Sequence, residues 1–158
     1  TTPMDKRPKL ILTNNMALTL GLFVFALSVL FLIKFHIALG LGLLLTSLFF
    51  ITYKKIVTIN QDTKTVTVCS MLFFVTYNKK THSFKEGRGK ILLINSTNEL
   101  FGIDRKSSTF FTYDVLYHLN GLGKVNVFTS TNASQADKTA NFLASNLNLD
   151  LENKIIAR

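Results

Sequence analysis

The side chains that could carry chemistry are few and widely spaced along this chain. Histidines occur at His36, His82 and His118, and the carboxylates are scattered. No pair of histidines has the spacing of a metal motif, and no Gly-x-Ser-x-Gly sequence marks a nucleophile on a sharp turn. The stretch Gly87–Lys90 lacks both the Walker spacing and a following helix. We therefore expect no catalytic residue, no metal site and no cofactor, and interpret the chain as a non-enzyme.

The single cysteine, Cys69, has little chemical promise where it stands. It lies in an alternating segment between Thr67 and Met71, where we expect a small apolar sheet residue. One cysteine forms no disulfide within the chain and no zinc site built on paired cysteines. The part of the chain outside the apolar runs is therefore compatible with a reducing compartment.

Basic side chains are the best candidates for binding. The polar stretch Asn78–Lys90 contains two glycines and is expected to be a loop, able to contact anionic lipid headgroups or a protein partner. Lys54 and Lys55 follow the second apolar run directly, so we expect them at a membrane surface, where each contributes about 1 kcal/mol near anionic lipid. The candidate lipid- or partner-binding set is Lys54, Lys55, Lys79, Lys80, Lys85, Arg88 and Lys90.

The distribution of charge argues against nucleic acid as a partner. The net charge is +9, but residues 1–55 hold six basic residues and one acid, while residues 56–158 hold twelve basic and eight acidic residues. The second part is only mildly basic and has no clustered Lys/Arg stripe, which is the usual footprint of nucleic-acid binding. The balance favours anionic lipid headgroups or acidic neighbours.

Two apolar runs dominate the first third of the chain. Met16–Ile33 and Ile37–Tyr53 carry no charge, are separated by Lys34–His36, and are each about one bilayer long. The first run is longer than a typical signal h-region, a second run follows at once, and no cleavage site is evident. The pattern predicts a two-helix transmembrane hairpin over residues 16–53 that remains in the protein.

Bases flank the two runs on their outer sides. Lys6, Arg7 and Lys9 precede the first run, and Lys54 and Lys55 follow the second. The positive-inside rule predicts an integral, multi-pass membrane protein with both termini and the soluble domain on the cytoplasmic, stromal or matrix side.

Small residues predict how the two helices pack. Folding the hairpin at the connection places Gly21 at the level of Phe49, and Gly42 at the level of Ser28. Two small-xxx-small spacings, which let membrane helices approach closely, are also present. The candidate helix-packing residues are Ala17, Gly21, Ser28, Ala38 and Gly42.

After Lys55 the apolar pattern alternates, which predicts an α+β architecture with a small antiparallel sheet domain. Its last element is an amphipathic helix over Ser134–Asn148, with Leu143 and Leu147 facing the sheet. The expected domains are a polar basic segment at 1–15, the hairpin at 16–53, the β domain with its helix at 54–150 and a polar tail at 151–158. The expected strands lie at 55–60, 65–69, 71–77, 91–95, 100–104, 109–119 and 125–129.

Two stretches carry a likeness to a known fold. Ile59–Val66 has a strand, a polar turn and a strand, and Phe128–Ser130 leads into the helix that includes Ser134–Leu143. Six or seven antiparallel strands closed by one amphipathic helix resemble the pleckstrin-homology-like (PH-like) fold. With the hairpin attached, the chain resembles the membrane-anchored PH-like proteins of bacteria and, more weakly, the photosystem I assembly protein family of cyanobacteria and chloroplasts.

The expected function is that of a non-catalytic, membrane-anchored subunit or assembly and scaffold factor of a larger membrane protein complex. The Phe-rich helices and the near absence of a linker after the second run favour this hypothesis. Its expected partners are the bilayer and other membrane subunits. An anionic-lipid-binding PH-like sensor and a small membrane-bound enzyme remain the alternatives.

Overall fold

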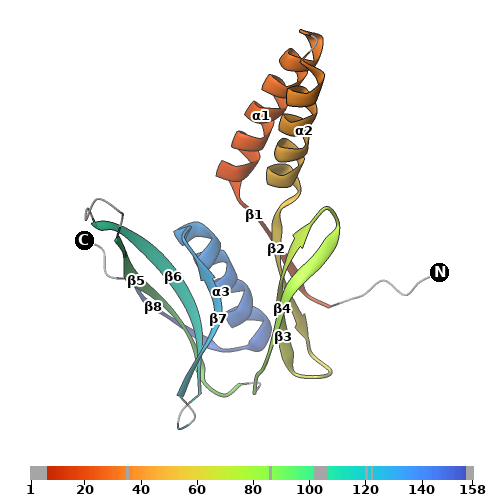
Figure 1. Ribbon diagram of the computed structural model, residues 1–158. Coiled ribbons are helices and arrows are strands. Elements are labelled where there is room, and N and C mark those ends of the chain that lie inside the picture. Colours follow the sequence, from red (N-terminus) through yellow and green to blue (C-terminus); the bar gives the residue numbers. More distant parts are fainter. Residues whose placement is uncertain are drawn as a thin grey trace, which may run out of the picture. The chain divides into compact units, whose positions relative to one another are not determined.

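The computed structural model describes residues 7–34, 36–85, 87–101, 107–119, 121 and 123–155, and its architecture is α+β, as the sequence predicts (Figure 1). Two helices near the N-terminus are followed by strands and a C-terminal helix. In chain order the elements are β1 (Lys9–Thr13), α1 (Asn15–Ile33), α2 (Ile37–Thr52), β2 (Lys54–Asn60), β3 (Thr65–Leu72), β4 (Val75–Ser83), β5 (Lys90–Phe101), β6 (Ser107–Leu119), β7 (Gly123–Ser130), α3 (Ala133–Leu147) and β8 (Asp150–Lys154).

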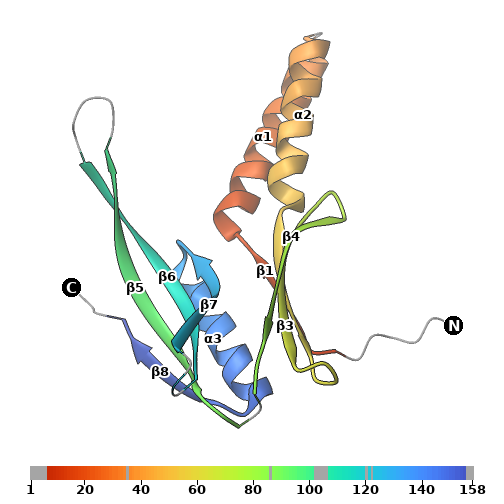
Figure 2. The ribbon, with the colours of Figure 1, turned by 60° about the horizontal axis from the view of Figure 1, so that its bottom comes forward.

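The strands form two four-stranded sheets, ordered β1-β2-β3-β4 and β7-β6-β5-β8. In the second sheet, β5 and β6 pair antiparallel over their full length, whereas β8 runs parallel to β5 at the sheet edge (Figure 2). Contacts divide the chain into two compact units, which are described separately below. The helix unit comprises Ile11–Val57 and Cys69–Lys80, and the sheet unit comprises the described residues within Thr1–Leu10, Thr58–Val68 and Thr81–Arg158.

The two apolar runs are helices with almost the predicted bounds. Asn14 caps α1, because its side-chain oxygen accepts hydrogen bonds from the backbone amides of Met16 and Ala17. By length and composition, α1 with its 19 residues is the one helix among the described residues that is long and apolar enough to cross a membrane. The equally apolar α2 has 16 residues and ends at Thr52.

Both helices continue almost directly into strands. Asn14 alone separates β1 from α1, and Tyr53 alone separates α2 from β2. Since β1 and β2 are neighbours in the first sheet, the helix pair begins and ends on adjacent strands. The polar basic segment predicted at 1–15 thus contains a strand, β1, whose Leu12 is 4% exposed.

Four other predicted bounds differ from the observed ones. The strand predicted at 71–77 is interrupted by a turn at Phe73 and Phe74, between the end of β3 and the start of β4. The stretch predicted as a loop from Asn78 is strand as far as Ser83, and the two strands predicted at 91–95 and 100–104 are one strand, β5, ending at Phe101. The predicted polar tail at 151–158 contains most of β8. Residues 102–106, which include most of the strand predicted at 100–104, lie outside the described part of the chain. Both β4 and β8 are edge strands with largely exposed side chains, so an apolar alternation does not mark them.

The sheet unit has its core between α3 and the second sheet. α3 packs against β5, β6, β7 and β8, and its Leu143 and Leu147 are 0% and 2% exposed, as their spacing predicts. From the sheet, Ile91, Leu93 and Val115 are fully buried. Asn132 caps α3 by accepting from two backbone amides, and the helix ends where Asn148 adopts a left-handed conformation with φ 52°. The amphipathic stripe of α3 thus closes this core.

Leu143→Ala is expected to lower the free energy of unfolding of the full chain in detergent micelles by about 2–5 kcal/mol, because it leaves a cavity in this core. Thermal or urea unfolding followed by circular dichroism measures the change. Lys138→Ala, at an exposed position of the same helix, is the matched control and should stay within about 0.5 kcal/mol of the parent. Equal stability of the two variants would contradict the assignment of Leu143 to the core.

Candidate membrane-facing and basic surfaces

Small residues form the seam between α1 and α2. Gly21, Ser28, Gly40 and Ser47 are the buried residues of the two helices, and in each helix the pair is seven residues apart. A repeat of seven returns to the same helix face after two turns. A Cβ atom on Gly21 would lie 2.8 Å from Cγ1 of Ile51, and one on Gly40 would lie 2.6 Å from Cγ of Leu32. Any larger side chain at either glycine therefore pushes the helices apart.

A hydrogen bond joins the helices across this seam. The Ser28 hydroxyl donates to the backbone carbonyl of Gly40 at 2.8 Å, and Ser28 is 0% exposed. The Ser47 hydroxyl is satisfied within α2 by the carbonyl of Leu44 at 2.7 Å. Both buried hydroxyls thus have partners, as groups removed from water require. A hydroxyl bond between membrane helices contributes on the order of 0.6–2 kcal/mol.

The predicted packing residues are partly right. Gly21 and Ser28 lie in the seam and Ala17 is half-buried, but Gly42 and Ala38 are exposed, and a Cβ on Gly42 would meet no atom within 4 Å. Ser28 is level with Gly40 rather than Gly42. Gly40 and Gly42 are two residues apart in α2, which places them on nearly opposite faces of the helix, so only one of them can face α1. Gly21 and Ser28 are seven residues apart, and so are Gly40 and Ser47. This shared spacing is the sequence signal that identifies Gly40, not Gly42, as the seam residue.

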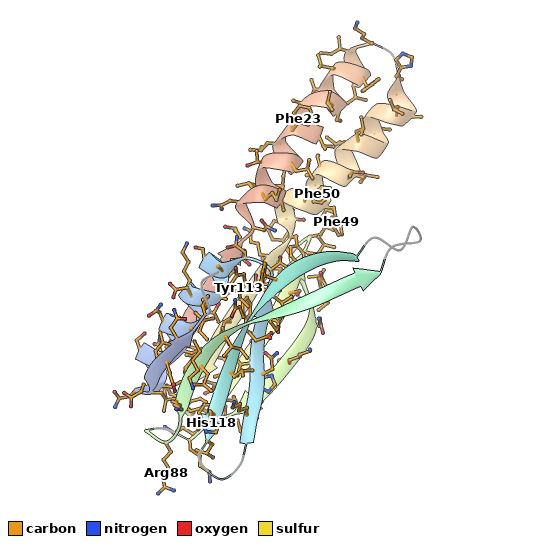
Figure 3. The ribbon with its side chains drawn as sticks, turned by 90° about the vertical axis from the view of Figure 1, so that its left-hand side faces the viewer. Phe23, Phe49, Phe50, Arg88, Tyr113 and His118 are labelled. Atoms are coloured by element: carbon orange, nitrogen blue, oxygen red, sulfur yellow. The ribbon has the colours of Figure 1, made fainter. Side chains whose placement is uncertain are left out.

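Large apolar side chains cover the outside of the helix pair. We call this surface the apolar belt. Soluble monomers rarely expose a continuous apolar patch of more than a few hundred Å². Figure 3 shows side chains projecting outward along both helices, Phe23 and Phe49 among them. The belt consists of the exposed residues Leu18, Leu20, Leu22, Phe23, Phe25, Val29, Leu30, Ile33, Ile37, Leu39, Leu41, Leu45, Leu48 and Phe49.

The structure divides the predicted basic set between the two units. In the helix unit, Lys54 and Lys55 begin β2 and are half-buried, and burial lowers the pKa of Lys55. Lys79 and Lys80 are exposed on β4 of the same unit. The other three, Lys85, Arg88 and Lys90, belong to the sheet unit. The bases predicted to share one loop therefore do not form a single described surface.

The β4–β5 connection is fixed by Tyr117. The Tyr117 hydroxyl donates to the carbonyl of Arg88 at 2.8 Å and accepts from the amide of Lys85 at 3.1 Å. Gly89 has φ 93°, and a Cβ there would lie 2.4 Å from the carbonyl oxygen of His118, so this position requires glycine. The exposed side chains of Lys85 and Arg88 thus extend from a constrained backbone.

Lys90 forms an ion pair within the chain instead. Its ammonium pairs with Glu152 on β8, and Lys154 contacts the other oxygen of that carboxylate at 2.9 Å. Hydrogen bonds from Lys90 and then Lys154 lower the pKa of Glu152 to about 2. Lys90 and Glu152 lie at the parallel pairing of β5 and β8. This lysine therefore acts in joining two strands and is a poor candidate for a lipid contact.

A polar cluster on the second sheet was not predicted. The Asp114 carboxylate accepts from the Thr129 hydroxyl at 2.6 Å, from Asn126 Nδ2 at 3.2 Å and from the Ser96 hydroxyl at 3.2 Å. These donors come from β5 and β7, on either side of Asp114 on β6. Their separation in sequence explains why no motif marks them. The cluster satisfies a partly buried carboxylate and cross-links three strands.

The remaining titratable groups do not converge. Among the described residues, His82 Nε2 and His118 Nδ1 are buried without a hydrogen-bond partner, and no three His, Cys, Asp or Glu side chains meet as metal ligands would. Cys69 is a half-buried free thiol on β3.

Comparison of the chain with protein-family models, with curated proteins and with solved structures gave no match. The likeness to PH-like proteins therefore stays a prediction. The seam, the apolar belt and the placement of the bases are the observations from which a function can be inferred.

Gly40→Ala is expected to destabilise the helix pair by about 1–3 kcal/mol, because the added methyl group overlaps Leu32. Gly42→Ala, two residues away in the same helix, is the matched control, since its methyl group meets open space and alanine favours a helix by about 1 kcal/mol over glycine. Thermal unfolding of both variants in detergent micelles, followed by circular dichroism, gives the comparison. An equal melting temperature for the two would contradict the observed seam.

Glu152→Gln should remove a pH-dependent part of stability. The pKa of Glu152 is lowered from 4.5 to about 2, so its stabilisation is present above about pH 4.5 and is lost as the pH falls towards 2. The difference in urea midpoint between parent and variant should shrink over that range. It should also shrink with added salt, because the pair is partly exposed. Lys90→Met tests the partner: if the two changes are additive at pH 7, the ion pair does not contribute.

Proposed function

We propose that this chain is a non-catalytic, membrane-anchored subunit or assembly factor of a larger membrane protein complex, with α1 and α2 as its transmembrane hairpin. The observation that supports this most is the apolar belt. Small residues face inward at Gly21, Ser28, Gly40 and Ser47, while the large apolar side chains face outward. Membrane helix pairs use small residues in this way, because lipid solvates their large ones.

The dimensions of the helices agree with a hairpin that crosses together. At 1.5 Å per residue, α1 spans about 28 Å and α2 about 24 Å, against a hydrocarbon core of about 30 Å. A helix that is somewhat short is accommodated by local thinning of the bilayer or by neighbouring helices, at a modest cost. Lys34, between the two helices, is exposed and can extend its amine to the headgroups. The basic residues on the outer sides of the hairpin favour a cytoplasmic, stromal or matrix location for the rest of the chain.

The β domain is proposed to bind protein partners. Two meandering sheets with a helix after the last meander strand support the likeness to PH-like domains, while the parallel strand β8 and the position of β1 before the hairpin depart from it. The likeness to membrane-anchored PH-like proteins, and more weakly to photosystem I assembly proteins, supports the proposal that such a domain acts beside membrane complexes. It carries no assignment of a particular complex.

The lipid-sensor alternative has weaker support. Of the candidate bases, Lys90 pairs with Glu152, Lys55 is half-buried, and the exposed ones are divided between two units. The remaining set of exposed bases is Lys79, Lys80, Lys85 and Arg88. No specific observation among the described residues favours a small membrane-bound enzyme.

Purification from its native membrane in mild detergent tests the proposal. The full chain should resist extraction at high pH and should co-purify with other membrane subunits in fixed stoichiometry. Replacing Lys79, Lys80, Lys85 and Arg88 by Ser should leave both results unchanged, because the apolar belt anchors the chain. In contrast, Phe23→Ala combined with Phe49→Ala should retain the anchor and reduce the recovery of partners.

Two outcomes would overturn the proposal. Release of the parent chain at high pH would exclude the transmembrane hairpin. Recovery of the parent chain alone, together with selective binding to anionic liposomes that the four-fold Ser variant loses, would favour the lipid sensor.

A further inference from the structure

The tip of the β3–β4 hairpin holds two phenylalanines in a conformation that neither packing nor backbone preference explains. Phe73 and Phe74 have φ angles of 48° and 65°, in the left-handed region that two-residue hairpin turns fill with Asn and Gly. A bulky residue there is a genuine outlier. Burial of the rings does not compensate for this backbone strain, since Phe73 is 44% and Phe74 is 88% exposed. Strain combined with exposure suggests a role for the rings outside the fold.

This tip lies beside the end of α2. The Phe73 amide donates to the Thr52 hydroxyl at 3.4 Å, and Thr52 is the last residue of α2. Both residues belong to the helix unit, and the turn between β3 and β4 lies next to the end of α2 in both ribbon views (Figures 1 and 2). Tyr53 and Lys54 follow Thr52, so this is the end of the helix where an aromatic and a cationic residue succeed the apolar run.

The same order of chemistry recurs along β4. Phe74 and Val75 at the tip are 88% and 66% exposed, Tyr77 is 43% exposed, and the exposed bases Lys79 and Lys80 follow. At about 3.3 Å per residue, the lysines stand roughly 17 Å from the tip. Apolar, then amphipathic, then cationic groups match the succession of acyl chains, interface and headgroups in a bilayer. The exposed side chains of β4 thus follow the sequence of environments that α2, Tyr53 and Lys54 follow.

We propose that Phe73 and Phe74 insert into the bilayer leaflet at the β2 end of α2, as a contact with lipid additional to the two helices. The occupant is the lipid interface itself, because the tip is hydrogen-bonded to Thr52 at the end of α2, three residues after Phe49 of the apolar belt. This inference rests on the proposed transmembrane hairpin. It adds that the β3–β4 hairpin is held against the membrane surface by its own strained turn.

The absence of tryptophan from the chain makes the test direct. Phe74→Trp gives a full-length protein with one tryptophan, reconstituted in zwitterionic phosphatidylcholine vesicles with or without lipid brominated near the headgroup end of its acyl chains. We expect a blue-shifted emission and loss of most of the intensity with brominated lipid. Phe49→Trp, on the apolar belt, reports independently on the helices, and Lys138→Trp, exposed on α3, gives the reference for a tryptophan in water.

The controls separate the two proposals. Quenching at position 49 without quenching or blue shift at position 74 would overturn the insertion and leave the hairpin standing. A blue shift at position 74 without quenching would mean that protein, not lipid, covers the ring, which also overturns it. Absence of quenching at both positions would overturn the transmembrane hairpin and, with it, this inference.

A turn variant checks that the rings are not needed for folding. Phe73→Asn combined with Phe74→Gly supplies the residues that such turns prefer. Its melting temperature in detergent micelles should equal or exceed that of the parent chain. A lower melting temperature would give the rings a structural role and overturn the argument from strain.

Discussion

The close approach of α1 and α2 at their glycines is the constraint on which the helix unit depends. Neighbouring strands lie about 4.8 Å apart, whereas packed helices are usually separated by 8–10 Å. Here β1 and β2 are neighbours, and only Asn14 and Tyr53 join them to the helices. Gly21 faces Ile51 at the end of the helix pair nearest these strands. Glycine at position 21 lets the helix axes lie closer together there, so that two neighbouring strands can continue into two packed helices without a linker.

The exposed edge strand β4 combines two opposing demands. An edge strand presents unpaired backbone groups, and proteins commonly protect such edges from association with charged side chains, lysine above all. Lys79 and Lys80 on β4 meet that demand, which gives them a structural role whether or not they contact lipid. The tip of the same strand does the opposite by exposing Phe74 and Val75. The proposed lipid contact at the tip would remove this conflict, because lipid would cover the apolar end while the lysines lie at the polar headgroups.

The sequence predicted best the elements that bury a continuous or periodic face. The bounds of α1, α2 and α3 are within about a residue of the observed ones, because long apolar runs and a 3.6-residue period are strong signals. It failed where an element depends on a distant partner. β8 gains its place by pairing with β5, some sixty residues earlier in the chain, and its sequence from Asp150 to Lys154 has almost no apolar pattern. The Asp114 cluster is likewise assembled from three strands.

The candidate surfaces were likewise predicted in part: local patterns in the sequence marked some features, and others depend on how the elements pair. Composition identified an apolar hairpin, but choosing Gly40 over Gly42 required the seven-residue spacing that Gly21–Ser28 and Gly40–Ser47 share, which composition alone does not reveal. The prediction of a single basic loop was wrong for a different reason. A run of bases was interpreted as one loop, whereas a strand carries Lys79 and Lys80, and an ion pair with Glu152 engages Lys90. Basic residues that are close in sequence therefore need not share one surface, because some lie on a strand and others follow it.

Magnitudes decide what a lipid contact by the β domain would do. Burying one phenylalanine contributes about 1.5–3 kcal/mol, and each base near anionic lipid about 1 kcal/mol. Helices of 19 and 16 nearly uniformly apolar residues would bury far more in lipid, so in the proposed transmembrane hairpin α1 and α2 would set the strength of anchoring. Contacts at Phe73 and Phe74 therefore contribute little to attachment. Under the proposed function, their physical effect would be to restrict how the β3–β4 hairpin tilts against the bilayer, and a restricted tilt would lower the entropy that the domain loses on binding a partner.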